Sequence, residues 1–294
     1  MGISKITNYF KLVKFSHTIF AMPFALIGFF MAVKYFNLEF NYYILLYVIL
    51  DMIFARNAAM GFNRYVDKNI DSKNPRTANR EIPKGIISPK NAIFFVIINS
   101  ILFIVTTYFI NKLTFYLSPV AIFTVLFYSY TKRFTWFSHI ILGIGLGLAP
   151  IGAFLAVSGY FNILPVLLSF AVVFWVSGFD VMYALQDYEF DKTNGLKSIP
   201  VFLGKRGALN LSIFLHFISI GLIFIFGVLS GLGILFWIGS IIFFVILIYQ
   251  HFLVKPNDLS RINLAFFTTN GVASVIFAIF TITDFYWQFN LIYS

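Results

Sequence analysis

The chain has 294 residues, of which 60% are hydrophobic and only 11% carry a charge. Soluble domains have roughly 25% charged residues, so no soluble core could hide this much apolar surface, and lipid must surround most of the chain. There is no cysteine, which excludes disulfides, zinc–thiolate sites and a cysteine nucleophile. The net charge of +10 would suit a nucleic-acid partner, but the placement of the basic residues has another explanation.

Long apolar runs follow one another along the chain. A membrane-spanning helix needs about 20 apolar residues, and the runs are continuous rather than alternating, which argues against a β-barrel. We predict an all-α, polytopic membrane bundle, a single domain over residues 1–294, with nine transmembrane helices around a central cavity and a cytoplasmic cap. The predicted spans are residues 15–36, 41–64, 91–110, 113–130, 138–159, 163–186, 208–229, 232–253 and 262–283.

Lysine and arginine divide unequally between the two sides of this bundle. Eighteen of the 21 lie at the N-terminus or in the loops after the second, fourth, sixth and eighth spans. The opposite loops carry only Lys34 and Lys112, and Arg56 lies within a span. By the positive-inside rule the basic side faces the cytoplasm. We therefore expect a multi-pass protein of the cell (inner) membrane, with its N-terminus and basic loops in the cytoplasm and no nucleic-acid partner.

Acidic residues gather in two segments on the basic side. The first segment, Asn63–Asp71, reads NRYVDKNID, and the second, Asp180–Asp191, reads DVMYALQDYEFD. Seven of the eleven acidic residues lie in or beside them: Asp67, Asp71, Glu81, Asp180, Asp187, Glu189 and Asp191. In a chain that is otherwise mostly hydrocarbon, two such clusters of carboxylates predict that something cationic is held there.

The two segments share a spacing of seven and then four residues. The first series is Arg56, Asn63 and Asp67, and the second is Asp180, Asp187 and Asp191. On a continuous α-helix these steps keep all three side chains on one face. An Ile-Pro pair and then a glycine follow each segment. We infer an internal repeat that places two similar helix ends around one cavity.

Two acidic helix ends that face each other would make an oxygen-rich site. Mg²⁺ prefers oxygen ligands and usually keeps waters and substrate phosphates, so one or two carboxylates per ion are enough. Nearby basic residues could hold the phosphate oxygens: Arg76, Arg80, Lys84, Lys132, Arg133 and Lys197. A single acidic pair would more often be a solvated loop, but two matched pairs favour a metal–diphosphate site.

Two charged residues, Asp51 and Arg56, fall inside a predicted span. Charges within a membrane are costly and usually face a cavity or each other. Arg56 shares the predicted face of Asn63, which favours a cavity-facing position, whereas Asp51 lies off that face and has no predicted role. His17, at the start of the first span, could meet a substrate. The other histidines are expected to be structural or interfacial: His139, His216 and His251.

The paired motifs, 120 residues apart from Asp67 to Asp187, resemble those of the UbiA superfamily of membrane prenyltransferases. Several stretches are similar to its 4-hydroxybenzoate polyprenyltransferase branch: Asn74–Pro83 (NPRTANREIP), Lys14–Leu26 (KFSHTIFAMPFAL), Tyr130–Thr135 (YTKRFT) and Asp187–Gly204. The resemblance covers residues from about 10 to 210, and the paired motifs are highly specific. The C-terminal spans are similar only in number.

The resemblance implies a magnesium-dependent reaction on a polyprenyl diphosphate. Asn63, Asp67, Asp71, Asp187 and Asp191 would bind the metal, and the four aspartates would be catalytic. The basic residues would neutralise the diphosphate, whose departure would leave an allylic cation for an electron-rich aromatic ring to attack. Asp180, two turns deeper, would orient the acceptor or a basic residue. The isoprenoid tail would run between the helices into the bilayer.

For the acceptor, the resemblance favours 4-hydroxybenzoate in a ubiquinone-type pathway, with a dihydroxynaphthoate in menaquinone biosynthesis as the alternative. A haem-farnesylating enzyme is less favoured, because that branch has a Met-containing form of the loop at residues 74–80. From another class, the alternative is a secondary transporter of an anionic solute. Carriers have broken helices near the membrane middle, whereas the polar residues here gather at one rim. The sequence does not encode the prenyl length or the oligomeric state.

Overall fold

A computed structural model describes residues 2–13 and 20–292, and every regular element in this part of the chain is a helix. The α-helices are α1 (Gly2–Leu12), α2 (Met22–Phe30), α3 (Tyr42–Val66), α4 (Lys68–Asp71), α5 (Pro89–Tyr108), α6 (Lys112–Thr131), α7 (Ser138–Ser158), α8 (Ile163–Tyr183), α9 (Tyr188–Thr193), α10 (Ile199–Ser230), α11 (Ile234–Leu253) and α12 (Thr269–Ile292). Two π-helical turns, η2 (Met31–Tyr35) and η4 (Leu264–Thr268), and a 3₁₀ turn, η3 (Ala184–Asp187), adjoin them. The predicted all-α class is confirmed.

Polar side chains mark where several of the long helices begin. Asn41 accepts hydrogen bonds from the first backbone amides of α3, and Asn111 does the same for α6. Asn162 caps α8, and Ser88, followed by a proline, caps α5. These side chains satisfy amides that the helix itself leaves without partners. The apolar runs therefore start at defined residues rather than fraying into the loops.

Eight helices of the described chain are long and apolar enough to cross a membrane, so the protein is an integral membrane protein. They correspond to eight of the nine predicted spans. The first predicted span, 15–36, begins in residues outside the described ranges. Its described part is the apolar segment Met22–Tyr35, which is shorter than the roughly 20 residues that a straight span needs.

Two helices extend beyond the predicted spans. Helix α10 begins at Ile199 rather than 208, and Gly204 interrupts it with a φ of +72°, a conformation that glycine adopts without a steric penalty. Helix α12 continues beyond the predicted end at 283 to Ile292. In both helices charged residues lie at the predicted boundary, Lys205 and Arg206 in α10 and Asp284 in α12, and they interrupt the apolar run from which the boundary was predicted.

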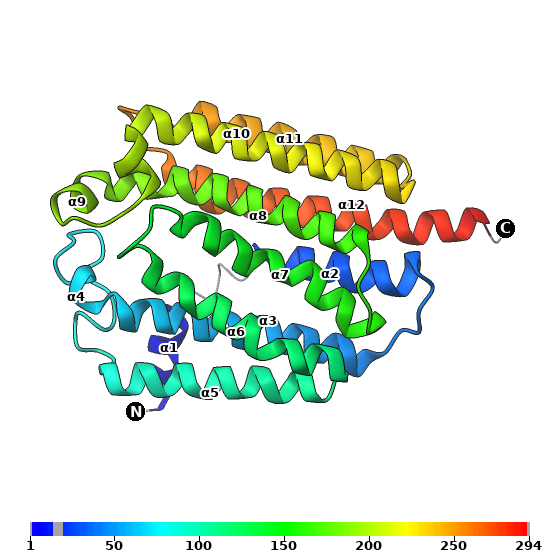
Figure 1. Ribbon diagram of the computed structural model, residues 1–294, viewed down its shortest axis with the longest axis horizontal. Coiled ribbons are helices and arrows are strands. Elements are labelled where there is room, and N and C mark those ends of the chain that lie inside the picture. The colour runs from blue at the N-terminus through cyan, green and yellow to red at the C-terminus, as the bar shows by residue number, and fades with distance from the viewer. Residues whose placement is uncertain (1, 14–19, 293–294) are drawn as a thin grey trace.

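The long helices lie side by side along the long axis of the molecule (Figure 1). Helix α8 packs between α7 and α10, α3 packs against α5 and α6, and α12 packs against α11 and α2. One close approach depends on a missing side chain. A Cβ atom at Gly28 of α2 would lie 2.0 Å from the Pro150 carbonyl oxygen of α7.

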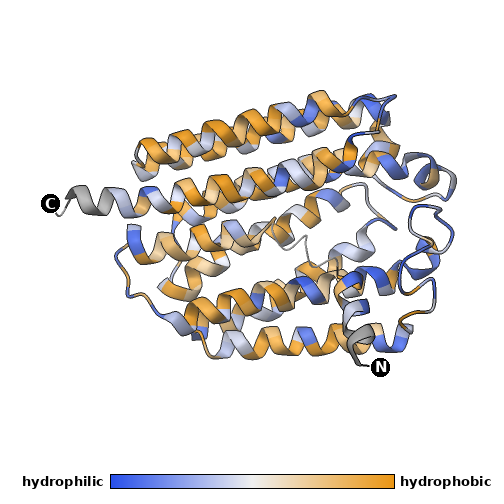
Figure 2. Ribbon diagram, turned by 180° about the vertical axis from the view of Figure 1, so that it is seen from behind, coloured by the Kyte–Doolittle hydropathy of each residue, from blue (hydrophilic) through white to orange (hydrophobic). Residues whose placement is uncertain are grey.

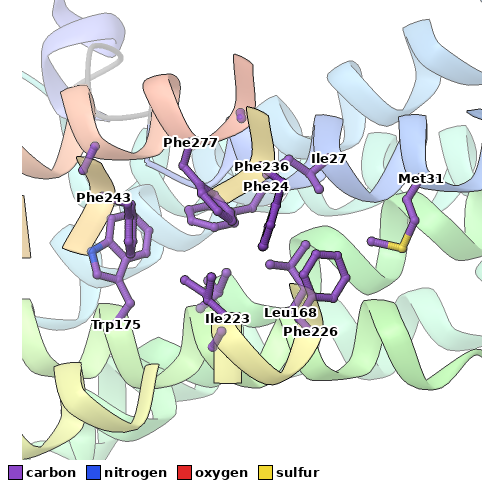
Figure 3. Close-up of a cluster of buried hydrophobic side chains, with 14 of the residues drawn as sticks. Phe24, Ile27, Met31, Leu168, Trp175, Ile223, Phe226, Phe236, Phe243 and Phe277 are labelled. Atoms are coloured by element: carbon purple, nitrogen blue, oxygen red, sulfur yellow. The ribbon is translucent and has the colours of Figure 1, made fainter. Parts of the chain in front are cut away.

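Aromatic and aliphatic side chains pack together in the core of the bundle (Figure 3). Trp175 of α8 lies 5.1 Å from Phe24 and 5.7 Å from Phe243, measured between ring centroids. Its indole nitrogen donates a hydrogen bond to Asn270, so the buried polar atom has a partner. This packed cluster joins α2, α8, α10, α11 and α12.

Helices α4 and α9, far apart in the sequence, lie at the same end of the molecule (Figure 1). Hydrophilic residues gather at that end, whereas the helices between the two ends are mostly hydrophobic (Figure 2). We call it the polar end and define it by α4, η3, α9 and the loops that follow α4 and α6. Both acidic segments therefore meet at one rim of the bundle, as predicted.

Candidate functional site

The first acidic segment follows the end of α3. Helix α3 ends at Val66, Asp67 leaves the helical conformation at φ −87° and ψ 5°, and α4 begins directly afterwards. Asn63, on the last turn of α3, donates a hydrogen bond to Asp67 Oδ2 at 3.1 Å. Asp71 closes α4 and is 5% exposed. The break between α3 and α4 thus places the side chains of Asn63, Asp67 and Asp71 at the polar end.

The second acidic segment is not one continuous helix. Helix α8 ends at Tyr183, the 3₁₀ turn Ala184–Asp187 follows, and α9 then begins. The prediction that Asp180, Asp187 and Asp191 share one helical face is therefore wrong. A 3₁₀ turn has three residues per turn rather than 3.6, so it rotates the later side chains away from the line of Asp180.

Each of the four predicted catalytic aspartates has a basic partner of its own. The pairs are Arg133–Asp67 at 2.9 Å, Arg80–Asp71 at 2.7 Å, Arg76–Asp187 at 2.9 Å from Nε to Oδ1, and Lys132–Asp191 at 2.7 Å. The carboxylates are largely buried, with Asp191 only 1% exposed. A buried charge without a partner is costly, so these pairs are what allows four carboxylates to gather at one place.

Two loops tie the acidic segments together. After α4, Asn74 and Arg76 reach across to Asp187, with an Asn74 Nδ2 to Asp187 Oδ1 distance of 2.9 Å. After α6, the neighbouring residues Lys132 and Arg133 separate, one to Asp191 and the other to Asp67. The structure therefore brings the two segments into a single site.

The remaining two predicted diphosphate ligands lie outside this network. Lys197 donates a hydrogen bond to the Phe134 carbonyl at 3.1 Å and lies over the ring of Trp136. Lys84 is exposed, and no ion pair joins it to an acidic side chain in the described part of the chain. Four of the six predicted cations are thus in contact with the aspartates.

The network shifts the pKa values of two of its residues, Asp67 and Arg76. Burial raises the pKa of Asp67 above its ordinary value, Arg133 opposes this rise, and Asp71 adds to it. Burial disfavours the charge of Arg76, but its hydrogen bond and attraction to Asp187 outweigh that effect and raise its pKa. Asp67 is thus a carboxylate that would gain from a further positive charge.

Asp180 lies apart from the four pairs. Its Oδ2 is 2.6 Å from Nδ1 of His139 on α7, a histidine that the sequence indicated only as structural or interfacial. The predicted acceptor residue His17 lies outside the described residues. Arg56, the third residue of that predicted group, lines a cavity inside the bundle.

This cavity has a volume of about 390 Å³ and lies between α3, α5, α6 and α7. None of its described lining residues comes from α8, α10, α11 or α12, so this cavity lies on the α3, α5, α6 and α7 side of the bundle. The α3 residues that line it recur every three or four positions: Val48, Asp51, Met52, Ala55, Arg56, Ala59 and Met60. Asn63 continues this series on the last turn of α3 and contacts Asp67, so this side of α3 leads from the cavity to the polar end. Asp51, which was expected to lie off the face of Asn63, also lines the cavity.

The predicted metal ligands do not make a preformed cage. Among the described residues, no three histidine or carboxylate side chains lie close enough together to hold a metal ion by themselves. The five predicted ligands still fit Mg²⁺, because this ion takes oxygen donors and commonly uses one or two carboxylates. Water and phosphate complete the shell of such an ion, so the fit requires a phosphate-bearing substrate.

Two residues of the site, Asn74 and His139, had no role predicted from the sequence. Asn74 follows the first acidic segment by only a few residues, but its contact with Asp187 depends on how the loop folds back. His139 lies on α7, and its partner lies on α8. Contacts across helices leave no periodic pattern, so only the fold reveals them.

Two curated relatives cover most of the chain. The 4-hydroxybenzoate octaprenyltransferase of Aliivibrio fischeri (strain MJ11) is 30% identical over 247 residues, which is 81% of this chain and 82% of that protein. The 4-hydroxybenzoate octaprenyltransferase of Francisella tularensis subsp. mediasiatica (strain FSC147) is 29% identical over 240 residues, with 81% of this chain and 83% of that protein covered.

Solved structures share the fold. A UbiA homolog from Aeropyrum pernix K1, solved in its apo form, has a TM-score of 0.82 and 30% identity over 91% of this chain and 98% of that one. A UbiA homolog from Archaeoglobus fulgidus bound to GPP and Mg²⁺ has a TM-score of 0.75 and 22% identity, over 95% and 99%. The family model described as the UbiA prenyltransferase family matches residues 21–272. With acidic segments, helical fold and relatives in agreement, the chain belongs to the UbiA prenyltransferase family.

Proposed function

We propose that this protein transfers a polyprenyl group from a polyprenyl diphosphate to an aromatic acid, with 4-hydroxybenzoate as the acceptor, in respiratory quinone biosynthesis. One observation carries the proposal. Four largely buried carboxylates, each beside a basic residue, lie beyond the end of an α3 face that lines an apolar cavity. A diphosphate with a metal ion needs both signs of charge, and an isoprenoid tail needs an apolar space next to them.

The proposed donor site uses both halves of the acidic cluster. Mg²⁺ would be held by Asp67 and Asp187, with Asn63, Asp71 and Asp191 as further oxygen donors, and it would neutralise charge on the leaving diphosphate. The basic residues of the four pairs would exchange their carboxylate partners for phosphate oxygens. Arg76 and Arg133 each carry a planar guanidinium, which can bind two oxygens of either a carboxylate or a phosphate. Positive charge fixed in this way stabilises the diphosphate as it departs.

The proposed acceptor site lies at the cavity below this cluster. Arg56 lines the cavity and carries a guanidinium, which pairs readily with a carboxylate. A bond forms between an electron-rich ring carbon of the acid and C1 of the prenyl group, while the bond from C1 to the diphosphate oxygen breaks. The ring then transfers its proton to the departed diphosphate and becomes aromatic again. Pairing of the acid's carboxylate with Arg56 would hold the ring next to C1.

The relatives support the substrates and the ion. Those from Aliivibrio and Francisella are named for 4-hydroxybenzoate and an octaprenyl group. The Archaeoglobus homolog was solved with GPP and Mg²⁺. The basic loops support an orientation with the polar end in the cytoplasm, in the inner membrane of the cell. No observation favours the transporter alternative, because the polar groups lie at one rim.

The test is a transfer assay on membranes that contain the protein, with Mg²⁺ and octaprenyl diphosphate. The acceptor panel holds 4-hydroxybenzoate, its methyl ester and a dihydroxynaphthoate. The proposal predicts product from 4-hydroxybenzoate and little from the ester, because the ester cannot pair with Arg56. It also predicts that Arg56→Gln raises KM for the acid about tenfold or more while changing KM for the donor little. Product from the dihydroxynaphthoate alone would refute the acceptor, and no product from any acid would refute the reaction.

A further inference from the structure

A second pocket lies between α10 and the end of α11, on the other side of the bundle from the cavity beside α3. It has a volume of about 330 Å³, and its lining includes Arg206, Asn210 and Ile213 of α10, His251 of α11 and Lys255 of the loop that follows. It shares no described lining residue with the cavity. Helix α10 starts at the end of the molecule where α9 lies, and α11 returns to that end (Figure 1). The proposed prenyl transfer uses none of these residues.

The lining of this pocket carries two positive charges and, among the described residues, no negative one. Arg206 and Lys255 are exposed and come from different segments of the chain, yet both line the pocket. Neither forms an ion pair in the described ranges, whereas the neighbouring Lys205 pairs with Glu189 at 3.1 Å. Asp258, which Lys255 attracts without forming an ion pair, lies outside the lining. Two like charges repel each other, so an anion bound between them would be stabilised.

Hydrogen bonds hold the walls of the pocket in place. The backbones of Lys255 and Asp258 exchange two hydrogen bonds, of 3.0 and 3.1 Å, which fix the loop after α11. His251 Nε2 lies 2.9 Å from Nδ1 of His216, and His216 Nε2 donates to the Trp175 carbonyl at 3.2 Å. The ring of His251 is therefore anchored to α10 and, through it, to α8. The pocket is formed before any ligand enters.

The pocket has a charged upper part and an apolar lower part. Helix α11 is long enough to cross the membrane and ends at Leu253, so Lys255 lies just beyond the hydrocarbon. Residues 206, 210, 213 and 217 recur every three or four positions and so follow one side of α10. Deeper on that side, Ile213 is 47% exposed and Phe217 is 73% exposed. A ligand here would meet positive charge at one end and apolar side chains below it.

We infer that this pocket binds the headgroup of an anionic phospholipid, with phosphatidylglycerol as its type. The phosphate would lie between the Arg206 guanidinium and the Lys255 ammonium, with the Asn210 amide as a further donor. The acyl chains would lie along Ile213 and Phe217. Basic pockets between membrane helices suit such headgroups, whereas a soluble phosphate would leave the apolar part empty. The inference does not depend on the proposed function, because lipid binding is measured without turnover.

The experiment measures lipid binding to the purified full-length protein in detergent by native mass spectrometry. Dioleoyl phosphatidylglycerol and dioleoyl phosphatidylcholine, which have the same acyl chains, are titrated separately. The wild type should bind phosphatidylglycerol about tenfold or more tightly than phosphatidylcholine, because each basic residue adds to the attraction. The double variant Arg206→Gln/Lys255→Gln should lose most of this preference, while its affinity for phosphatidylcholine stays the same. Glycerol 3-phosphate, at the concentration of the lipid, should not displace phosphatidylglycerol.

Lys90→Gln/Arg261→Gln is the matched control, because it removes two charges from exposed residues that lie outside the pocket lining. It should keep the preference of the wild type. The inference is overturned if the pocket variant keeps that preference, or if the control loses as much of it, which would show a general attraction to a basic surface. Displacement by glycerol 3-phosphate would assign the pocket to a soluble phosphate and overturn the lipid.

Single substitutions keep the inference testable if the double pocket variant does not fold. Arg206→Gln and Lys255→Gln each change one exposed side chain. Each should lower the preference for phosphatidylglycerol about threefold. A wild-type preference in both single variants would overturn the inference.

Discussion

Arg76 and Asp187 join the two acidic segments across 111 positions of the sequence. The guanidinium Nε donates to Asp187 Oδ1 at 2.9 Å, and Nη2 donates to Oδ2, so the pair is bidentate. Asn74 donates to the same carboxylate. Asp187 is therefore held in one orientation by two residues of the loop that follows α4. This contact and the pairs made by Lys132 and Arg133 together hold the two halves of the site in place.

Arg76→Lys keeps the charge but loses the planar fork that binds both carboxylate oxygens. We expect turnover to fall about tenfold or more, because Asp187 would lose its fixed orientation. Steady-state kinetics with saturating Mg²⁺ measures the effect. Arg261→Lys, at an exposed position before η4, is the control and should match the wild type. Wild-type kinetics in Arg76→Lys would show that the fork has no such role.

Mg²⁺ should bind well only together with a diphosphate. No three acidic or histidine side chains of the described chain form a metal site alone, and the four aspartates are already paired with cations. We expect weak binding of Mg²⁺ by itself and at least about tenfold tighter binding when inorganic diphosphate is present. Titration calorimetry with and without diphosphate measures the difference. Equal affinities in the two titrations would mean that the protein holds the ion unaided.

The pH dependence of Mg²⁺ binding should follow Asp67. Burial raises the pKa of this carboxyl, with Arg133 opposing the rise and Asp71 adding to it. A metal ion binds the carboxylate form, so protons compete with it, and affinity falls as the pH drops through the raised pKa. The loss of affinity should therefore begin at a higher pH than it would for an aspartate that is fully exposed to water.

Substituting Arg133 tests the direction of this pH effect. Arg133→Gln removes the cation that opposes the rise, so the pH at which Mg²⁺ affinity falls should move upward. The measurement is the half-saturating Mg²⁺ concentration for turnover, taken from about pH 7.5 down to about pH 5. A downward move in Arg133→Gln would contradict the assignment of Asp67.

Gly28→Ala should destabilise the bundle, because the new methyl group would collide with the Pro150 carbonyl, a backbone atom that cannot turn away. Overpacking of this kind costs roughly 1–3 kcal/mol. Gly221→Ala is the matched control within α10, since nothing lies within 4 Å of a Cβ there. It should be neutral or stabilising, because alanine favours the helix. Thermal unfolding of both variants in the same detergent measures the difference in stability. Equal midpoint temperatures for the two variants would show that α2 can move away from α7.

The sequence predicted the helical fold well because lipid imposes long apolar runs. The runs that became α5, α6, α7 and α11 were placed within a few residues of their ends. The first span was harder to judge, because its apolar run continues from residues outside the described ranges into the short segment Met22–Tyr35. Hydropathy alone cannot tell a full span from a short buried helix.

The candidate site was predicted by residue type but not by contact. The spacing of Asp180, Asp187 and Asp191 suggested one helical face, yet the 3₁₀ turn at Ala184–Asp187 breaks it. Which cation meets which carboxylate depends on how the loops after α4 and α6 fold, and nothing in the sequence fixes that. Asp51 had no predicted role because its partner Thr106 and the cavity appear only when α3, α5, α6 and α7 are assembled.

The central claim is that the two acidic segments form one metal–diphosphate site. The most direct measurement is prenyl transfer by Asp67→Ala and Asp187→Ala, one variant from each segment, in membranes that contain equal amounts of inserted protein. Asp258→Ala, at an exposed acid in the loop before η4, is the control. We predict that both site variants lose activity by about a hundredfold or more, while the control keeps it. Near-normal turnover in either site variant would contradict the claim.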